Sequence, residues 1–313
     1  MSPSSPAATV MDAAFETDGL EALILDVPEA HIRLQPHDEA DRVQVQAAVP
    51  GVDPDVAEGL SDRKRISTHR SGDRLRVFGR RLSEGTVDWR WRHDRPTSIC
   101  LDVYLPAGMR VAAQAAGGTV EASDLPGPLD LTVPGGSVHA TGLSGALQVQ
   151  GSGGDVSIQD STDLALTLEW AAGAITLTRL RQSSITLRAQ SCPTTVRDLG
   201  GSTDLSVHGA ALTLQHVTGS CEAHVRGAPL TYHGAPTQDT TLHTVGGPLQ
   251  THLPPDHPAA LTLTGSHVTL DDAFSFEGTR TARRVEGQLN GGGASFEGRA
   301  VQGTAQCRTL AGT

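Results

Sequence analysis

The sequence has few aromatic residues: Phe, Trp and Tyr together supply only ten of its 313 residues. Globular cores of this size normally rely on more aromatic volume. Glycine is abundant instead, with 35 residues. This composition argues against a wide, aromatic-rich interior and favours a narrow one filled by Val, Leu, Ile and Ala.

Long apolar runs and an export signal are also missing. No run approaches the 18 apolar residues of a membrane-spanning helix, so we expect no membrane span. The first residues, 1–6, lack a basic segment followed by an apolar core and do not resemble a secretory signal. We therefore expect a cytoplasmic protein with reduced thiols.

Cysteine is sparse, and its four copies are widely spaced. They are Cys100, Cys192, Cys221 and Cys307. Neither a disulfide framework nor a zinc site has such spacing. We expect four isolated, buried thiols, since a free cysteine behaves as a small apolar residue.

The net charge of −11 is unevenly distributed, and one segment is basic. Residues 61–95 hold eleven basic and five acidic residues, whereas residues 1–60 hold two and twelve. Arg interleaved with Trp can follow phosphates and stack on bases. The candidate partner contacts in 74–92 are Arg74, Arg76, Trp89, Arg90, Trp91 and Arg92. Their alternation with Leu75 and Val77 is equally typical of a strand with one solvated face, so nucleic acid is an alternative and not the partner we expect.

From about residue 117 the chain repeats a Gly turn followed by a short alternating strand. The apolar anchors of successive copies are Val120, Val138, Val156, Ile175, Val196, Leu212, Leu230 and Leu249. Their mean spacing is about 18 residues. Alternation with period 2, interrupted by Gly or Pro, indicates strands and argues against helices.

Strands of three to five residues cannot bury an apolar face alone, but equivalent strands of successive repeats can stack. We therefore predict an all-β protein, a β-solenoid of short rungs of about 18 residues with an N-terminal β cap region. Val120, Val138, Val156 and Ile175 would share one inward column. The predicted parts are a disordered tail (1–19), the β cap region (20–116), the solenoid repeats (117–253) and a closing C-terminal β segment (254–313). Candidate cap strands are 23–27, 30–34, 43–47, 74–78 and 99–105, with a longer loop over 50–65.

Three sequence features resemble the DUF4097 family, whose members are often labelled adhesins. They are the segments 22–28 and 101–108 and the Gly-Gly-x-Val turns near 117 and 153. The resemblance covers roughly residues 20–310. It implies a β-repeat fold, and it implies no catalytic residues.

Histidine is frequent late in the chain, and its spacing follows the repeat. Counted from the anchors, His208, His224 and His243 form a predicted outward ladder, and His233 and His252 form a second one. Stacked imidazoles can bind zinc. A solvated polar column without a ligand explains the pattern equally well, so we predict no metal and no cofactor.

Enzyme signatures such as Gly-x-Ser-x-Gly, His-Glu-x-x-His and the P-loop are absent from the sequence. We predict a non-catalytic interaction or scaffold protein that presents a β-solenoid surface to a protein or glycan partner. One alternative is a self-assembling, bactofilin-like structural element. The other is nucleic-acid binding through residues 74–92. Homo-oligomerisation is left open.

Overall fold

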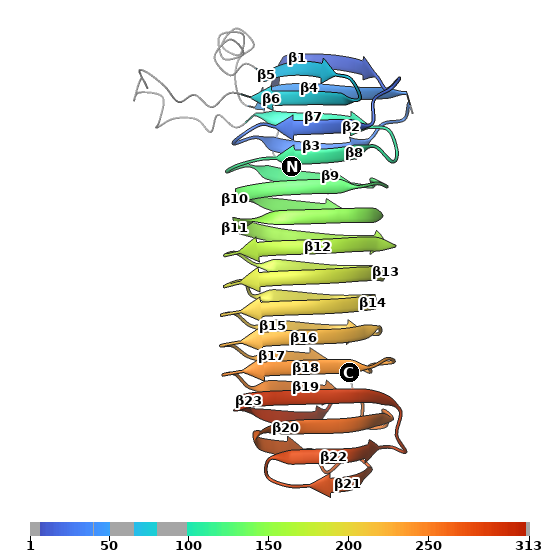
Figure 1. Ribbon diagram of the computed structural model, residues 1–313, viewed down its shortest axis with the longest axis vertical. Helices are drawn as coiled ribbons and strands as arrows, with labels where there is room; N and C mark the ends of the chain where they lie inside the picture. Colours follow the sequence, from blue (N-terminus) through green and yellow to red (C-terminus); the bar gives the residue numbers. More distant parts are fainter. Residues whose placement is uncertain (1–6, 40, 51–65, 80–98, 311–313) are drawn as a thin grey trace, which may run out of the picture. The chain divides into compact units, whose positions relative to one another are not determined.

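The structure, a computed structural model, describes residues 7–39, 41–50, 66–79 and 99–310. The regular elements of this part of the chain are all β-strands (Figure 1). It contains no helix that could cross a membrane. The chain divides into two compact units, an N-terminal unit (Met1–Gly153) and a C-terminal unit (Gly154–Thr313).

The strands of the N-terminal unit include all five predicted cap segments. They are β1 (Ala7–Glu16), β2 (Ala22–Asp26), β3 (His31–Pro36), β4 (Arg42–Pro50), β5 (Ile66–Ser71), β6 (Arg74–Gly79), β7 (Cys100–Leu105), β8 (Arg110–Gln114), β9 (Thr119–Ser123) and β10 (Leu129–Thr141). The division between the units falls within β11 (Gly145–Thr162). The predicted loop at 50–65 lies almost wholly outside the described residues.

Parallel pairing begins much earlier than residue 117, and it does not follow chain order. Strand β2 pairs in parallel with both β6 and β8, and β3 pairs in parallel with both β7 and β9. The coil formed by residues 22–36 therefore lies between two coils that come later in the sequence. Strands β8 and β9 then pair in parallel with β10, so that Val111 lies beside Leu129 and Val120 beside Val138.

Antiparallel strands complete the N-terminal unit. Strand β4 pairs with β7, β1 pairs with β4, and β5 pairs with β6. The assignment of residues 1–19 to a disordered tail is therefore wrong for residues 7–16. This segment is ordered because its backbone completes the hydrogen bonds of β4 along the whole strand.

The C-terminal unit consists of twelve further strands, together with the end of β11. They are β12 (Leu164–Ala171), β13 (Ile175–Gln190), β14 (Thr194–His208), β15 (Leu212–Val217), β16 (Ser220–Arg226), β17 (Leu230–His233), β18 (Thr240–Val245), β19 (Leu249–Leu253), β20 (Ala259–Leu270), β21 (Phe276–Arg280), β22 (Arg284–Leu289) and β23 (Ala294–Thr309).

The parallel register of this unit confirms the repeat length and corrects one anchor. Thr194 pairs with Ile175 on one side and with Leu212 on the other, so successive partners are 19 and 18 residues apart. Val196, the predicted anchor, pairs instead with Leu177 and Leu214. The anchor was displaced by two residues because the structurally equivalent position is the polar Thr194, whose side chain is buried.

Several strands are much longer than the three to five residues predicted. Strands β13 and β14 have 16 and 15 residues. Each continues through a corner, where Arg179 and Asp198 adopt positive φ values of 53° and 53°. A single residue with left-handed geometry turns the chain without ending the ladder, so one strand forms two sides of a coil.

The last regular coil is covered by a strand from near the C-terminus. The first part of β23 pairs in parallel with β18 and the second part with β19. The opposite edge of β23 pairs in parallel with β20, which is followed by antiparallel β22 and β21. As in the N-terminal unit, the order of the strands in the sheet therefore differs from their order in the sequence, because β23 lies between β20 and the pair β18 and β19.

The interior of each unit is filled by the inward residues of the alternating strands. The partners Val120 and Val138 are both buried, and so are Val156 and Ile175. The largest fully buried side chains are Tyr232 and Phe296, whose rings meet edge to face with centroids 5.5 Å apart. Aliphatic residues supply most of the remaining core, as the composition indicates.

Glycine serves two distinct purposes at the corners. At Gly219 a Cβ would lie 1.5 Å from the carbonyl oxygen of Gly201 in the preceding coil, so only glycine permits this approach. At Gly227 a Cβ would meet nothing within 4 Å, but φ is +75°. Left-handed backbone of this kind favours glycine for conformational reasons alone.

Candidate binding surfaces

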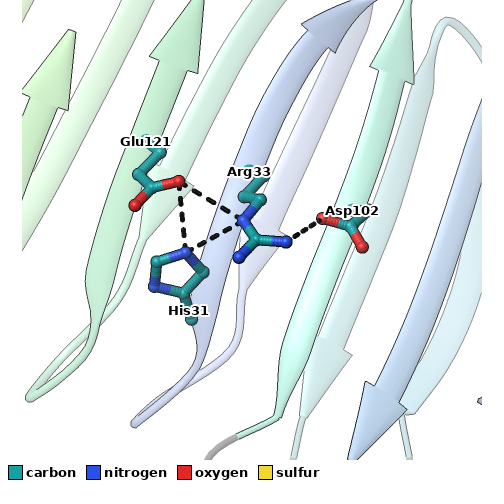
Figure 2. A network of polar contacts seen from close by, with 4 residues as sticks. All are labelled: His31, Arg33, Asp102 and Glu121. Carbon is teal, nitrogen blue, oxygen red and sulfur yellow. Dashed lines mark hydrogen bonds and ion pairs between the residues drawn. The ribbon is translucent and has the colours of Figure 1, made fainter. Parts of the chain in front are cut away.

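Four polar side chains of the N-terminal unit form a network across β7, β3 and β9 (Figure 2). Arg33 Nη1 donates to Asp102 Oδ1 over 3.5 Å, and Arg33 Nε lies 3.3 Å from Glu121 Oε2. His31 Nε2 lies 3.1 Å from Arg33 Nε and 3.3 Å from Glu121 Oε2. The network therefore joins β3 to both of its parallel neighbours.

The partners in this network satisfy one another. A neutral His31 can accept a hydrogen bond from Arg33 Nε through Nε2, and a protonated His31 can donate one to Glu121 instead. Two carboxylates surround one guanidinium, so Arg33 is balanced by acids on both sides. We interpret the network as a clamp that holds the out-of-order coil in place.

The cysteines have the isolated character that their spacing predicts. All four are free; Cys192, Cys221 and Cys307 are buried, and Cys100 is partly buried. Burial raises the pKa of Cys221 and of Cys307 to about 11. Burial also raises the pKa of Cys100, which lies beside His31 in the register. These residues are protonated thiols at neutral pH.

The Arg/Trp stretch is only partly described. Trp89, Arg90, Trp91 and Arg92 lie outside the described residues. Arg74 and Arg76 are exposed on β6, as the alternation predicts. Arg76 donates to Asp26 Oδ2 over 3.0 Å and lies over the Phe78 ring. The described part of this stretch is therefore an ordinary solvated strand face, and partner binding through it stays a prediction.

The predicted three-histidine ladder is wrong at His208. His224 and His243 are register partners with ring centroids 5.5 Å apart, but the partner of His224 on β14 is Ser206. His208 is aligned with Arg226. The error follows from the displaced anchor at Val196, which shifted the count on β14 by two residues. The second ladder is confirmed, because His233 and His252 are register partners.

Each coil of the C-terminal unit contributes outward residues to two different faces. On one, which we name the mixed-charge face, acids and bases both occur. Its two central columns are Thr167, Thr186, Asp204, Glu222, Thr241 and Glu297 in one and Glu169, Arg188, Ser206, His224, His243 and Arg299 in the other. Arg188 pairs with Glu169 over 3.3 Å, and His224 pairs with Glu222 over 3.0 Å.

The other face, which we name the Thr–His face, carries hydroxyls, amides, imidazoles and guanidiniums. Its twelve positions form two columns across β13, β14, β15, β17, β19 and β23. They are Thr176, Thr195, Thr213, Thr231, Gln250 and Gln306 in one column and Thr178, Arg197, Gln215, His233, His252 and Arg308 in the other. The spacing of His233 and His252 predicted part of this face. The threonine column was not predicted, because the anchor at Val196 was two residues away from the true register position.

Two stacked imidazoles lie at one end of the Thr–His face. The rings of His233 and His252 are 4.4 Å apart between centroids and are nearly parallel, with 6° between their planes. Burial, followed by the charge of His216, lowers the pKa of His233. Burial, followed by the charges of His233 and Arg308, lowers the pKa of His252. Both rings are therefore largely neutral at pH 7.

The described residues contain no group of three or more His, Cys, Asp or Glu side chains arranged to hold a metal ion. The two histidine pairs stand on different faces, and each has only two imidazoles. Stacked, parallel rings also do not direct their nitrogen lone pairs at a common point. What the two faces offer is hydrogen bonding and charge.

No family model and no curated protein matches the sequence. Solved structures of low similarity do match it. A "putative lipid binding protein" from Parabacteroides distasonis is 12% identical over 96% of both chains, with a TM-score of 0.38. A "putative adhesin" from Parabacteroides merdae is 10% identical over 97% of both chains, with a TM-score of 0.38. A "putative cell adhesion protein" from Clostridium sporogenes is 9% identical over 97% of this chain, with a TM-score of 0.27. Values this low carry no functional inference.

Proposed function

We propose that the chain is a non-catalytic interaction or scaffold protein that presents a β-solenoid surface to a macromolecular partner. The observation that carries this proposal is the in-register alignment of outward side chains across consecutive coils. Four threonines are an example, because each pairs in register with the next across neighbouring strands: Thr176, Thr195, Thr213 and Thr231. Adjacent parallel strands lie about 4.8 Å apart, so these four threonines form a regular row of hydroxyl groups.

The parallel coils within each unit are what we interpret as a β-solenoid, in keeping with the resemblance to the DUF4097 family. Strands β14 to β19 are hydrogen-bonded to parallel neighbours on both edges, so their outward groups lose little conformational entropy when a partner binds. A repeating surface of this kind suits a repeating partner. One polymer chain can contact several coils at once, and such contacts add avidity.

End-to-end polymerisation is less favoured by the strand edges. Among the described residues of the N-terminal unit the outer antiparallel strands are β1, which has ten residues, and β5, which is short, polar and largely exposed. In the C-terminal unit the outer antiparallel strand is β21, which has five residues. Short polar edge strands discourage pairing with a second copy. Light scattering after size-exclusion chromatography should show one discrete mass that does not grow with concentration.

The proposal is tested by measuring binding and turnover together. Immobilised protein should bind at least one purified polysaccharide or protein saturably, and dissociation from a repeating polymer should slow as the polymer lengthens. The same polymer should be recovered with its length unchanged. Release of products by the pure protein, or equal affinity for a monomer and its polymer, would contradict the proposal.

A further inference from the structure

We propose that the Thr–His face is a binding site for an acidic polysaccharide, with the sugar carboxylates or sulfates on its basic column and the sugar hydroxyls on its threonine and glutamine column. This inference rests on the proposed function, because it names the chemistry of the partner. It concerns only the C-terminal unit, and all of its residues are described.

The charge of the face favours an anionic ligand. Its twelve positions include Arg197 and Arg308 and the imidazoles of His233 and His252, and none of the twelve is Asp or Glu. Arg197 Nε donates to Gln215 Oε1 over 2.8 Å, which leaves its positive charge without a carboxylate partner in the described structure. Arg308 is exposed and has no carboxylate within ion-pair distance among the described residues, although its charge, after the hydrogen bonds from Ala273 and Thr309, contributes to the lowered pKa of Asp271. A chain with a net charge of −11 thus has a local positive surface here.

The uncharged positions of the face favour a glycan over a protein partner. The column beside the bases consists of threonine hydroxyls and glutamine amides, which both donate and accept hydrogen bonds. A sugar hydroxyl needs such partners. Apolar and aromatic groups form the buried core of a protein–protein interface, whereas each of the twelve positions here carries a polar side chain. Guanidinium groups bind carboxylate and sulfate oxygens through paired N–H donors.

The stacked histidines link this site to pH. The charged groups that face them are Arg308 on β23 and His216 at the end of β15. Strands β15, β17 and β19 present only Thr, Gln and His there. Two acids interact with these cations: Asp198 lies 3.0 Å from His216 Nδ1, and Asp271, which accepts hydrogen bonds from the backbone and hydroxyl of Thr309, interacts with Arg308. A bound anion would offset the repulsion between two protonated rings, so ligand binding should take up protons.

Dextran sulfate, polygalacturonate and uncharged dextran of matched length are suitable probes in low salt. We expect both acidic polymers to bind at least about tenfold more tightly than dextran, a difference of about 1.4 kcal/mol. We expect affinity to rise as the pH falls from 8.0 to 5.5. Calorimetry in two buffers of different ionisation enthalpy should show net proton uptake near pH 6.5.

Double variants with the same change in charge on the two faces distinguish binding at the Thr–His face from nonspecific attraction to the charge of the protein. Arg197→Ala/Arg308→Ala should weaken dextran sulfate binding at least about tenfold. Arg188→Ala/Arg299→Ala, which removes the same charge from the mixed-charge face, should leave binding within about twofold. His233→Gln/His252→Gln should abolish the proton uptake and retain binding at pH 8.0. All of these side chains point outward, and circular dichroism melts would verify that the variants fold.

Each contrary result has a definite meaning. Equal loss in the two arginine variants, or no preference for the acidic polymers over dextran, would overturn this inference. So would tighter binding of single-stranded DNA than of either acidic polymer. In each of these cases the proposed function survives if another polymer or protein binds saturably. Hydrolysis of a bound polymer would instead contradict the proposed function and leave the assigned site intact.

Discussion

The two faces of the C-terminal unit are built from the same coils, yet they differ in one kind of residue. The two columns compared on each face have twelve positions, and each set of twelve includes two arginines and two histidines. The mixed-charge face adds four acids, Glu169, Asp204, Glu222 and Glu297. The Thr–His face has none.

The difference in acidic residues shows that folding constrains the inward positions and not the outward ones. The inward residues are fixed by alternation and burial on both faces, and outward positions tolerate any residue that suits a strand. On the mixed-charge face two of the bases pair with acids, Arg188 with Glu169 and His224 with Glu222. On the Thr–His face they are available to a ligand. The following predictions test whether the faces share one scaffold and whether their charges act as described.

The largest expected effect is the loss of the scaffold under both faces. Gly219→Ala would place a Cβ 1.5 Å from the Gly201 carbonyl oxygen, and the next nearest atoms, at 2.5 and 2.6 Å, also belong to the Gly201 backbone, which cannot rotate away as a side chain could. We expect destabilisation by more than about 3 kcal/mol. The matched control is Gly227→Ala, where no atom lies within 4 Å and only the positive φ is unfavourable, at about 1 kcal/mol. Equal melting temperatures for the two variants would show that the coil spacing is wrong.

The second effect distinguishes the faces by pH. Burial is the main cause of the lowered pKa of His233 and His252 on one face and of His243 on the other. These groups favour the folded state fully above their unfolded value of about 6.5, and that stability is lost as the pH falls through the lower folded values. Urea melts at pH 7.5 and 5.0 should show the loss. His233→Gln/His252→Gln should reduce it, and an unchanged difference would contradict the assignment.

A smaller effect concerns the clamp in the N-terminal unit. Arg33→Met would leave Asp102 and Glu121 without their shared cation. The side chains are partly exposed, so we expect destabilisation of about 1 kcal/mol at pH 7. Arg76→Met, which removes a single exposed pair with Asp26, should cost less than about 0.5 kcal/mol. Equal costs would mean that the network adds nothing beyond one surface ion pair.

The smallest effect compares single arginines on the two faces of the C-terminal unit. Arg188→Ala removes an exposed ion pair and should cost about 0.5 kcal/mol or less. Arg308→Ala removes a cation that repels protonated His252 and attracts Asp271, so the two effects should offset each other and leave the stability nearly unchanged. Chemical denaturation at low salt would resolve the difference. Addition of 1 M salt should bring the two variants together, because salt screens exposed charges.

The repeat was accessible to sequence analysis because alternation and glycine spacing both follow from the coil. Period 2 fixed the inward residues, and Gly-Gly turns marked corners such as Gly117–Gly118. The register failed where an inward position is polar. Thr194 and Thr251 are buried and carry hydroxyls, which donate to the carbonyls of Cys192 and Gln306. Hydropathy alone cannot align such positions.

The candidate site was only partly predictable for the same reason. The spacing of His233 and His252 revealed one pair, whereas His208 was placed beside His224 by an error of two residues. The clamp around Arg33 could not have been found from repeats, because β3 pairs with β7 and β9 and is not next to either in the sequence. Out-of-order coils bring together residues whose separation carries no periodic signal.

The placement of β23 has a consequence for synthesis of the chain. Strands β18 and β19 are translated well before their partner, since Thr240 pairs with Phe296, 56 residues later. While the ribosome adds those residues, the edge of the last regular coil is open, and β20 has no partner for its parallel edge. Folding of this unit must therefore finish by insertion of a late strand between two earlier ones, a topologically slow step. A nascent chain arrested before residue 294 would keep two unpaired edges, and these are where chaperones or a neighbouring nascent chain would act.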